Sequence, residues 1–217
     1  MNKSVKILIA VLAVCVLLTS VLTVWLLFFR APKLSTIYDR VVELVEASHE
    51  VNTVFFGAGL PVYATDSVYA QYSHMYYGFE YEGLYESVTE SSKFISTMDI
   101  EMAAEKVYSK AYLEDVLYPM AFTGYAIDNG IGGTEFAHAR YYENETWIYQ
   151  ATTAKNYISG GMRIYDYSTM KIVYPSNTEV CYVTMDTWLE DSPERVLEVE
   201  LRLVLQDGQW YLDSFTG

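Results

Sequence analysis

The feature that most constrains this chain is an apolar run from Ile7 to Phe29, which contains no charged residue and no proline. Its only hydroxyl-bearing members are Thr19, Ser20 and Thr23. At about 1.5 Å of rise per residue, one helix over this run covers the hydrocarbon core of a bilayer, which is about 30 Å thick. The sequence therefore predicts a membrane contact through residues 7–29.

The run is longer than the apolar part of a secretory signal, which has about 7–15 residues and ends at small residues. It leaves through Leu27-Phe28-Phe29-Arg30, which offers no such cleavage site. A lipoprotein signal cleaved before Cys15 remains an alternative, but Val14 stands where a small residue is needed. We expect a retained anchor in residues 1–33, followed by one domain in residues 34–217.

The charges that flank the run are nearly balanced, so they orient the helix only weakly. Lys3 and Lys6 precede it, and three basic residues follow it by position 40. Short cationic N-termini usually stay in the cytoplasm, and all 28 acidic residues of the chain lie beyond Phe29. We therefore predict a single-pass protein of the cell membrane, with its N-terminus in the cytoplasm and its C-terminal domain outside the cell.

The charge of residues 34–217 excludes one class of partner. This part carries all 28 acidic residues and 10 basic residues, a net charge of −18. Such a field repels nucleic acid, which binds clusters of lysine and arginine. The 21 tyrosines, 9 phenylalanines and 4 tryptophans of the chain are enough to build a packed core despite this charge.

Cysteine use indicates the compartment. Cys181 is the only cysteine beyond the apolar run, so the domain has no internal disulfide. Secreted animal proteins usually carry several disulfides. The sequence therefore favours the surface of a Gram-positive bacterium.

No motif of an enzyme or of a cofactor site occurs in the sequence. It has no P-loop, no dinucleotide-binding glycine pattern, no zinc-site spacing and no G-x-S-x-G. Cys181 alternates with Val183 and Met185, which predicts a core position for it, and His49 beside Glu50 is predicted to be solvated. We predict a protein that is not an enzyme and holds no cofactor and no metal.

Two helices are predicted from apolar spacing. The first has an N-cap at Ser35 or Thr36, and Gly57 ends it. Its apolar stripe consists of Ile37, Val41, Leu44, Val45, Ser48, Val51 and Phe55. The second is predicted over Ile100–Tyr118, with Asp99 as its cap and Pro119 as its stop.

The remaining pattern is one of strands. We predict a loop and one or two strands in residues 61–93, and a hairpin formed by residues 140–142 and 147–149. Further strands are predicted over residues 163–174, 180–189 and 196–205. Asp207-Gly208 then predicts a tight turn into Gln209–Asp213. The expected class is α+β, with helices packed on a bent antiparallel sheet.

The ending Val204-Leu205-Gln206-Asp207-Gly208-Gln209-Trp210-Tyr211-Leu212-Asp213 resembles the last hairpin of the NTF2-like (cone) superfamily. In that superfamily a hydrophobic strand, a D-G turn and a strand with tryptophan close the sheet. The resemblance implies that residues 34–217 form a single NTF2-like domain.

A second resemblance is to the D,L-endopeptidase-inhibitor family of Gram-positive cell walls. It is carried by Asn52-Thr53-Val54-Phe55-Phe56-Gly57, by Met102 to Ala111 and by the same closing hairpin. Proteins of that family inhibit peptidoglycan hydrolases, and this chain departs from them in keeping an anchor. The resemblance implies an inhibitor or regulator of wall hydrolases, and no inhibitory residue is transferred.

Candidate site residues come from two groups. Tyrosines are enriched in binding surfaces, and six are dense enough to form a patch, unless half of them pack the core: Tyr63, Tyr72, Tyr76, Tyr77, Tyr81 and Tyr85. Cone-fold enzymes use an acid and a tyrosine inside the cone, for which the candidates are Tyr125, Asp128 and His138. We predict a non-catalytic binding domain at the bacterial cell envelope, whose partner is an envelope protein or a wall hydrolase. A small-molecule binder or a cone-pocket enzyme is the alternative.

Overall fold

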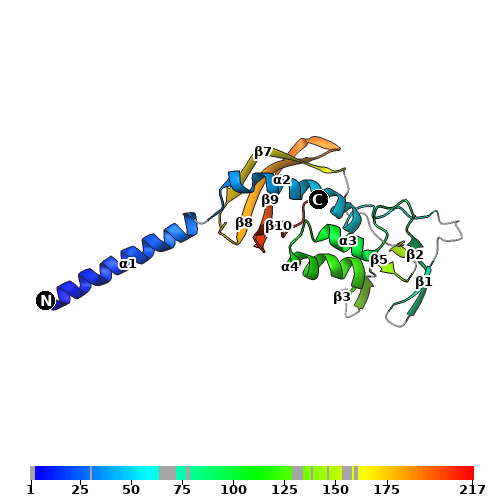
Figure 1. Cartoon of the computed structure of the whole chain (residues 1–217), viewed down its shortest axis with the longest axis horizontal. Helices are drawn as coiled ribbons and strands as arrows, with labels where there is room; N and C mark the ends of the chain where they lie inside the picture. The colour runs from blue at the N-terminus through cyan, green and yellow to red at the C-terminus, as the bar shows by residue number, and fades with distance from the viewer. Residues whose placement is uncertain are drawn as a thin grey trace.

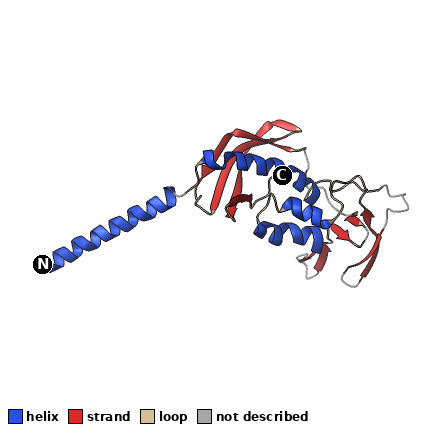
Figure 2. Ribbon diagram, viewed as in Figure 1, coloured by secondary structure: helices blue, strands red, loops and turns tan. Residues whose placement is uncertain are grey.

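The structure, a computed structural model, combines helices with antiparallel sheets, so the predicted α+β class is confirmed (Figures 1 and 2). The residues that it describes are 3–29, 31–63, 72–76, 79–128, 134–137, 139–145, 147–152, 158 and 161–217.

Helix α1, Lys3–Phe29, forms one continuous helix of 27 residues over the apolar run. It extends away from the other elements (Figure 1). Its side chains are described without a gap from Val11 to Val24, and every one of them is exposed. Over the part of the chain that the structure describes, no helix is both long and apolar enough to cross a membrane.

Helix α2, Leu34–Phe55, carries the predicted apolar stripe, and all seven of its predicted members are buried. Asn52 and Val54 are buried with them. The predicted start was wrong. The N-cap is Lys33, which makes no side-chain capping bond, and the Thr36 hydroxyl donates to the Lys33 carbonyl at 2.7 Å instead of capping.

The main sheet has the strand order β10-β9-β8-β7, with every pair antiparallel. Its strands are β7 (Arg163–Val173), β8 (Val180–Leu189), β9 (Ser192–Gln206) and β10 (Gln209–Leu212). Cys181, Val183 and Met185 of β8 are fully buried, and Leu201 and Leu203 of β9 lie opposite them. This apolar face packs against the stripe of α2.

The predicted closing hairpin is confirmed. Asp207 and Gly208 both have positive φ angles, of 50° and 79°, as a two-residue type I′ turn requires. The turn pairs Leu205 with Trp210 and Leu203 with Leu212. Alternation along β9 places Leu197 and Leu205 on the same face as Leu201 and Leu203, but Leu197 and Leu205 are exposed.

A second antiparallel sheet has the order β1-β2-β6-β5. Its strands are β1 (Tyr72–Tyr76), β2 (Phe79–Ser87), β5 (Tyr141–Glu143) and β6 (Ile148–Ala151), so the predicted hairpin and the two strands of the tyrosine-rich segment are confirmed. Strands β3 (Tyr125–Asp128) and β4 (Thr134–Ala137) form a separate two-stranded ribbon.

The predicted second helix is broken in two, and this prediction was wrong. Helix α3, Thr97–Ala104, is capped by Ser96 in a capping box whose third helical residue is Asp99. The chain then forms a parallel bridge from Tyr108 to Leu212, in which the Leu212 N–H donates to Val107 and the Ser109 N–H donates to Leu212. Pairing with β10 thus overrides the local preference for helix.

The helical path also continues past Pro119, where it was predicted to stop. Helix α4 (Lys110–Tyr112) leads into the π-helical turns η1 (Leu113–Leu117) and η2 (Pro119–Thr123). Proline blocks a normal helical hydrogen bond to the fourth preceding carbonyl, and wider π turns occur where that ladder is interrupted. Gly124, with a positive φ of 72°, ends the path.

A buried polar cluster joins four segments around Thr216, which is 1% exposed. The Thr216 hydroxyl shares a 2.6 Å hydrogen bond with Ser48 and accepts a 2.7 Å bond from the Asn52 amide. Tyr108 donates to the Asn52 amide oxygen at 2.6 Å, and Tyr165 of β7 donates to the Thr216 carbonyl. The cluster fixes α2, the bridge at Tyr108, β7 and the segment after β10 relative to one another.

Replacing Thr216 by valine is expected to lower the free energy of unfolding by about 1–3 kcal/mol, because the isosteric side chain leaves buried partners without their hydrogen bond. Urea unfolding of the full chain in detergent micelles measures the change. The control is Thr53→Val on the exposed side of α2, which should stay within about 0.5 kcal/mol of the native chain. Equal stability of the two variants would contradict the role of the cluster.

Candidate functional site

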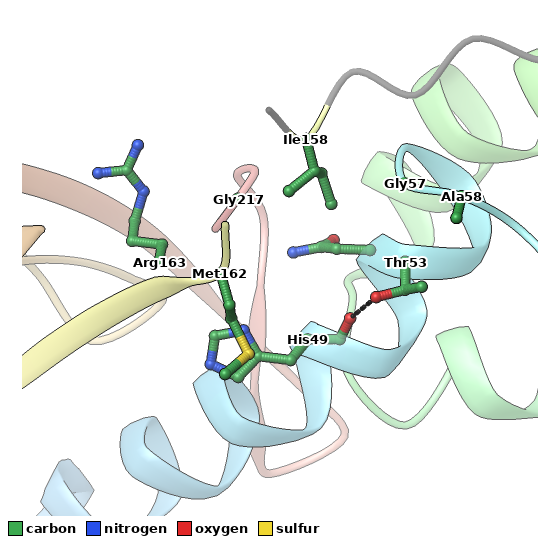
Figure 3. A pocket seen from close by; sticks show the side chains of 9 residues that line it. His49, Thr53, Gly57, Ala58, Ile158, Met162, Arg163 and Gly217 are labelled. Carbon is green, nitrogen blue, oxygen red and sulfur yellow. Dashed lines mark hydrogen bonds between the residues drawn. The ribbon is translucent and has the colours of Figure 1, made fainter. Parts of the chain in front are cut away.

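A cavity of about 220 Å³ lies beside the buried cluster, between the C-terminal half of α2, the start of β7 and the segment that follows β10 (Figure 3). Three of its polar lining residues, His49, Asn52 and Thr53, come from α2. They are spaced by three and four residues, which places them on one side of the helix. Ile158 and Met162 give the opposite wall an apolar surface.

The polar groups of the α2 wall are already used by the fold. The Asn52 amide belongs to the Thr216 cluster. The Thr53 hydroxyl donates to the His49 carbonyl at 2.9 Å, as the dashed line in Figure 3 shows. Neither side chain is therefore set up to act as a nucleophile.

On the β7 side, Arg163 lies at the rim of the cavity, across from Thr53 (Figure 3). Its Nη1 donates to the Thr187 hydroxyl at 3.0 Å, which fixes the guanidinium against β8. A guanidinium has five N–H donors, so this one bond leaves capacity for an acceptor on a ligand.

His49 is half-buried, and the prediction that it would be solvated was wrong. Its ring centroid lies 6.2 Å from that of Tyr165. Burial lowers the pKa of His49, although the nearby Glu46 carboxylate acts in the opposite direction. The imidazole is therefore neutral near pH 7, and the carboxylate of Glu46 is itself held by the Tyr167 hydroxyl at 2.6 Å.

The described groups of this cavity lack the pairings of two common kinds of catalytic site. Among the described residues no hydrogen bond joins the His49 imidazole to a hydroxyl or a thiol, which is the pairing that an activated nucleophile needs. The described part also holds no group of three His, Cys, Asp or Glu side chains placed to ligate a metal. A neutral imidazole, a fixed guanidinium and an apolar wall can hold a small ligand.

Of the six tyrosines predicted to form a surface patch, Tyr85 does not reach the surface, and for this residue the prediction was wrong. It is fully buried, and its hydroxyl donates to the Ala139 carbonyl at 2.8 Å, so it packs the second sheet and offers no contact surface. Tyr63 is half-buried, and its backbone N–H donates to Ser87. For three others, Tyr72, Tyr76 and Tyr81, only the strand backbone is described, and Tyr77 lies outside the described residues.

Of the three predicted cone-pocket residues, the two that the structure describes do not line the cavity of Figure 3. The backbones of Tyr125 and Asp128 lie in the β3–β4 ribbon, paired with Ala137 and Thr134. His138 lies outside the described residues. The proposed role of this group stays a prediction.

The residues that line the cavity carried only a weak signal in the sequence. His49 follows Ser48, a member of the buried stripe of α2, so helical spacing puts the side chain of His49 at the edge of that stripe.

The prediction that Cys181 occupies a core position is confirmed, because its side chain is fully buried, and burial raises the pKa of its thiol.

Comparison with protein-family models and with curated proteins gives no match for this chain.

In the His49→Gln variant, the free energy of unfolding is expected to fall less on acidification than it does in the native chain. Because the pKa of His49 in the folded chain lies below its ordinary value of 6.5, the unfolded chain binds more protons in the pH range just below 6.5. The free energy of unfolding therefore falls as the pH falls through that range, and the glutamine variant lacks this contribution.

Urea midpoints measured at about pH 7.5, 6.5 and 5.5 test this prediction. Thr53→Val serves as the control, since it changes the same cavity and keeps the imidazole. Identical pH slopes for the native chain and the His49→Gln variant would refute the assignment.

Proposed function

We propose that this chain is a non-catalytic binding protein of the bacterial cell envelope, anchored in the cell membrane by residues 7–29. Its N-terminus lies in the cytoplasm, and residues 34–217 form the extracytoplasmic binding domain. The observation that carries the proposal is the surface of α1.

The apolar side chains of α1 that the structure describes have no cover from the other described residues. The large ones that are described, between Val5 and Val24, are each between 43% and 65% exposed. Residues Val11 to Val24 make about four turns, so the apolar surface runs around the whole helix. A helix that is hydrophobic on all sides needs an apolar environment.

The three hydroxyl groups of α1 also suit an apolar environment. Thr19 donates to the carbonyl of Cys15, Ser20 to that of Val16 and Thr23 to that of Thr19, at distances between 2.7 and 3.0 Å. In a lipid core each polar group must find a partner inside the protein. The hydroxyls of α1 therefore add little to the cost of insertion.

The domain that follows is proposed to be NTF2-like. The four-stranded sheet β10-β9-β8-β7 with α2 across one face, and the type I′ closing hairpin, are the features that support this proposal. Binding is favoured over catalysis because the polar groups in the cavity of Figure 3 are largely engaged in structural hydrogen bonds.

Two further functions stay open as proposals. A small-molecule ligand is supported by the cavity near His49 and Arg163. Regulation of wall hydrolases rests on the resemblance of the sequence to their inhibitors, and it is tested by adding the purified chain to a wall-lysis assay, where slower lysis is expected.

The double variant Leu17→Arg with Leu18→Arg is expected to remove the chain from carbonate-washed membranes. Each arginine at the centre of a spanning helix costs about 2.5–3.5 kcal/mol of insertion free energy. The matched control, Leu17→Val with Leu18→Val, keeps the apolar surface and should remain in the membrane fraction. Equal distribution of both variants would contradict the anchor.

The orientation has a separate test. Protease added to intact protoplasts is expected to degrade residues 34–217, because the domain is proposed to face outward. Protection of the domain until the membrane is permeabilised would show the opposite orientation.

A further inference from the structure

A second cavity lies between the bridge at Tyr108, the helical path from α4 to η1, and the turn that joins β9 to β10. Its volume is about 330 Å³, at the lower end of the range for small-molecule pockets, which is about 300–1,000 Å³. The Gln206 amide oxygen accepts a hydrogen bond from the Lys110 backbone at 3.1 Å, which holds the hairpin turn against the start of α4. All of the residues that line this cavity belong to the described part of the chain.

Aromatic rings form much of the wall of this cavity. Tyr108, Tyr118 and Tyr211 line it together with the buried Leu113. Tyr108 is held in place by its hydrogen bond to Asn52. The faces of tyrosine rings attract cations within about 6 Å of the ring centre.

The charged residues around the cavity are mostly acidic. Glu105, Glu114 and Asp207 line it, against the single cation Lys110. The Lys110 ammonium is 3.7 Å from the Glu114 carboxylate, and both side chains are exposed, so this ion pair is weak. The cavity is thus negative even within an acidic domain, and it attracts a positively charged ligand.

The Tyr118 hydroxyl is a polar group inside this aromatic wall. Its oxygen is buried and has no hydrogen bond of normal geometry within the described residues. Burial raises the pKa of Tyr118, and so do the nearby carboxylates of Glu105, Glu101 and Glu114. The phenol therefore stays neutral, and the negative potential at this wall comes from the carboxylates.

The same surroundings already hold one cation of the protein itself. The Arg40 guanidinium lies over the Tyr211 ring at 5.5 Å from its centre, and its Nε donates to the Trp210 carbonyl at 3.0 Å. A tyrosine ring of this cavity therefore accepts a delocalised cation in the folded chain.

We propose that the cavity between Tyr108, Tyr118 and Asp207 binds the ammonium group of a small organic cation. The partly exposed rings of Tyr118 and Tyr211 contact the methyl or methylene groups next to the nitrogen, and Glu105 with Glu114 balances the charge. The inference names a ligand class for the binding domain proposed above and rests on that proposal.

The test compares choline with its neutral isostere 3,3-dimethylbutanol, using the full chain in uncharged detergent micelles at constant ionic strength. Shifts of the tyrosine ring signals in NMR spectra are followed during each titration, with the Tyr118 signal assigned from the Tyr118→Phe variant. Choline is expected to saturate its shift with a millimolar dissociation constant, roughly tenfold below that of the isostere. Equal binding of the two compounds, or no saturable shift with choline, would overturn the proposal.

Three variants locate the site. Tyr118→Leu is expected to weaken choline binding at least roughly fivefold, whereas Tyr118→Phe keeps the ring and should bind like the native chain. Lys110→Gln should tighten binding, because it removes the cation that competes for Glu114. The matched control is Glu194→Gln, an exposed acid at the other end of β9, which should have no effect.

Folding of each variant is checked by near-ultraviolet circular dichroism. If Tyr118→Leu does not fold, the exposed substitution Glu105→Gln supplies the second measurement, with at least roughly twofold weaker binding expected. Unchanged choline binding in a folded Tyr118→Leu or in Glu105→Gln would refute the site. The titration takes place in micelles, so its outcome is independent of whether α1 inserts into a cell membrane.

Discussion

The hydrogen bonds around the Thr216 hydroxyl are the constraint on which the arrangement of the domain depends. Ser48 and Asn52 belong to α2, Tyr108 to the break between α3 and α4, and Thr216 to the segment after the closing hairpin. Buried polar groups cost free energy unless each finds its partner, so this cluster is satisfied in only one arrangement of these segments. Asn52 of the cluster lines the cavity near His49 and Tyr108 lines the aromatic cavity, so the cluster helps to shape both.

The sequence was a good guide where one periodic pattern decided the structure. The stripe of α2 and the alternation of Cys181, Val183 and Met185 were predicted residue by residue, because burial of one face sets their spacing. The closing hairpin was predicted from Asp207-Gly208, since few other residue pairs accept two positive φ angles in succession. These features are local, and tertiary contacts reinforce them.

The errors fall where a contact distant in sequence decides the structure. The spacing of Ile100–Tyr118 is helical, yet pairing with Leu212 opens it at Tyr108. Tyr85 belongs to the dense group of tyrosines that predicted a surface patch. Its hydroxyl instead finds a buried partner in the Ala139 carbonyl. His49 was placed in solvent because its neighbour Glu50 is charged, whereas Tyr165 of β7 packs against its ring. No single-sequence pattern carries these pairings, so the two cavities were not predicted.

The hydrogen bonds of the Thr216 hydroxyl also set the order in which the domain can be completed. The residues joined by the Asn52–Thr216 bond are 164 positions apart, and those joined by the Ser48–Thr216 bond are 168 apart. Contacts of such long range form late, since much chain entropy is lost before they are made. While residues 209–216 are still being synthesised, α2 lacks the partners that lock it. A chain built in this way becomes rigid only after its last hairpin has been made.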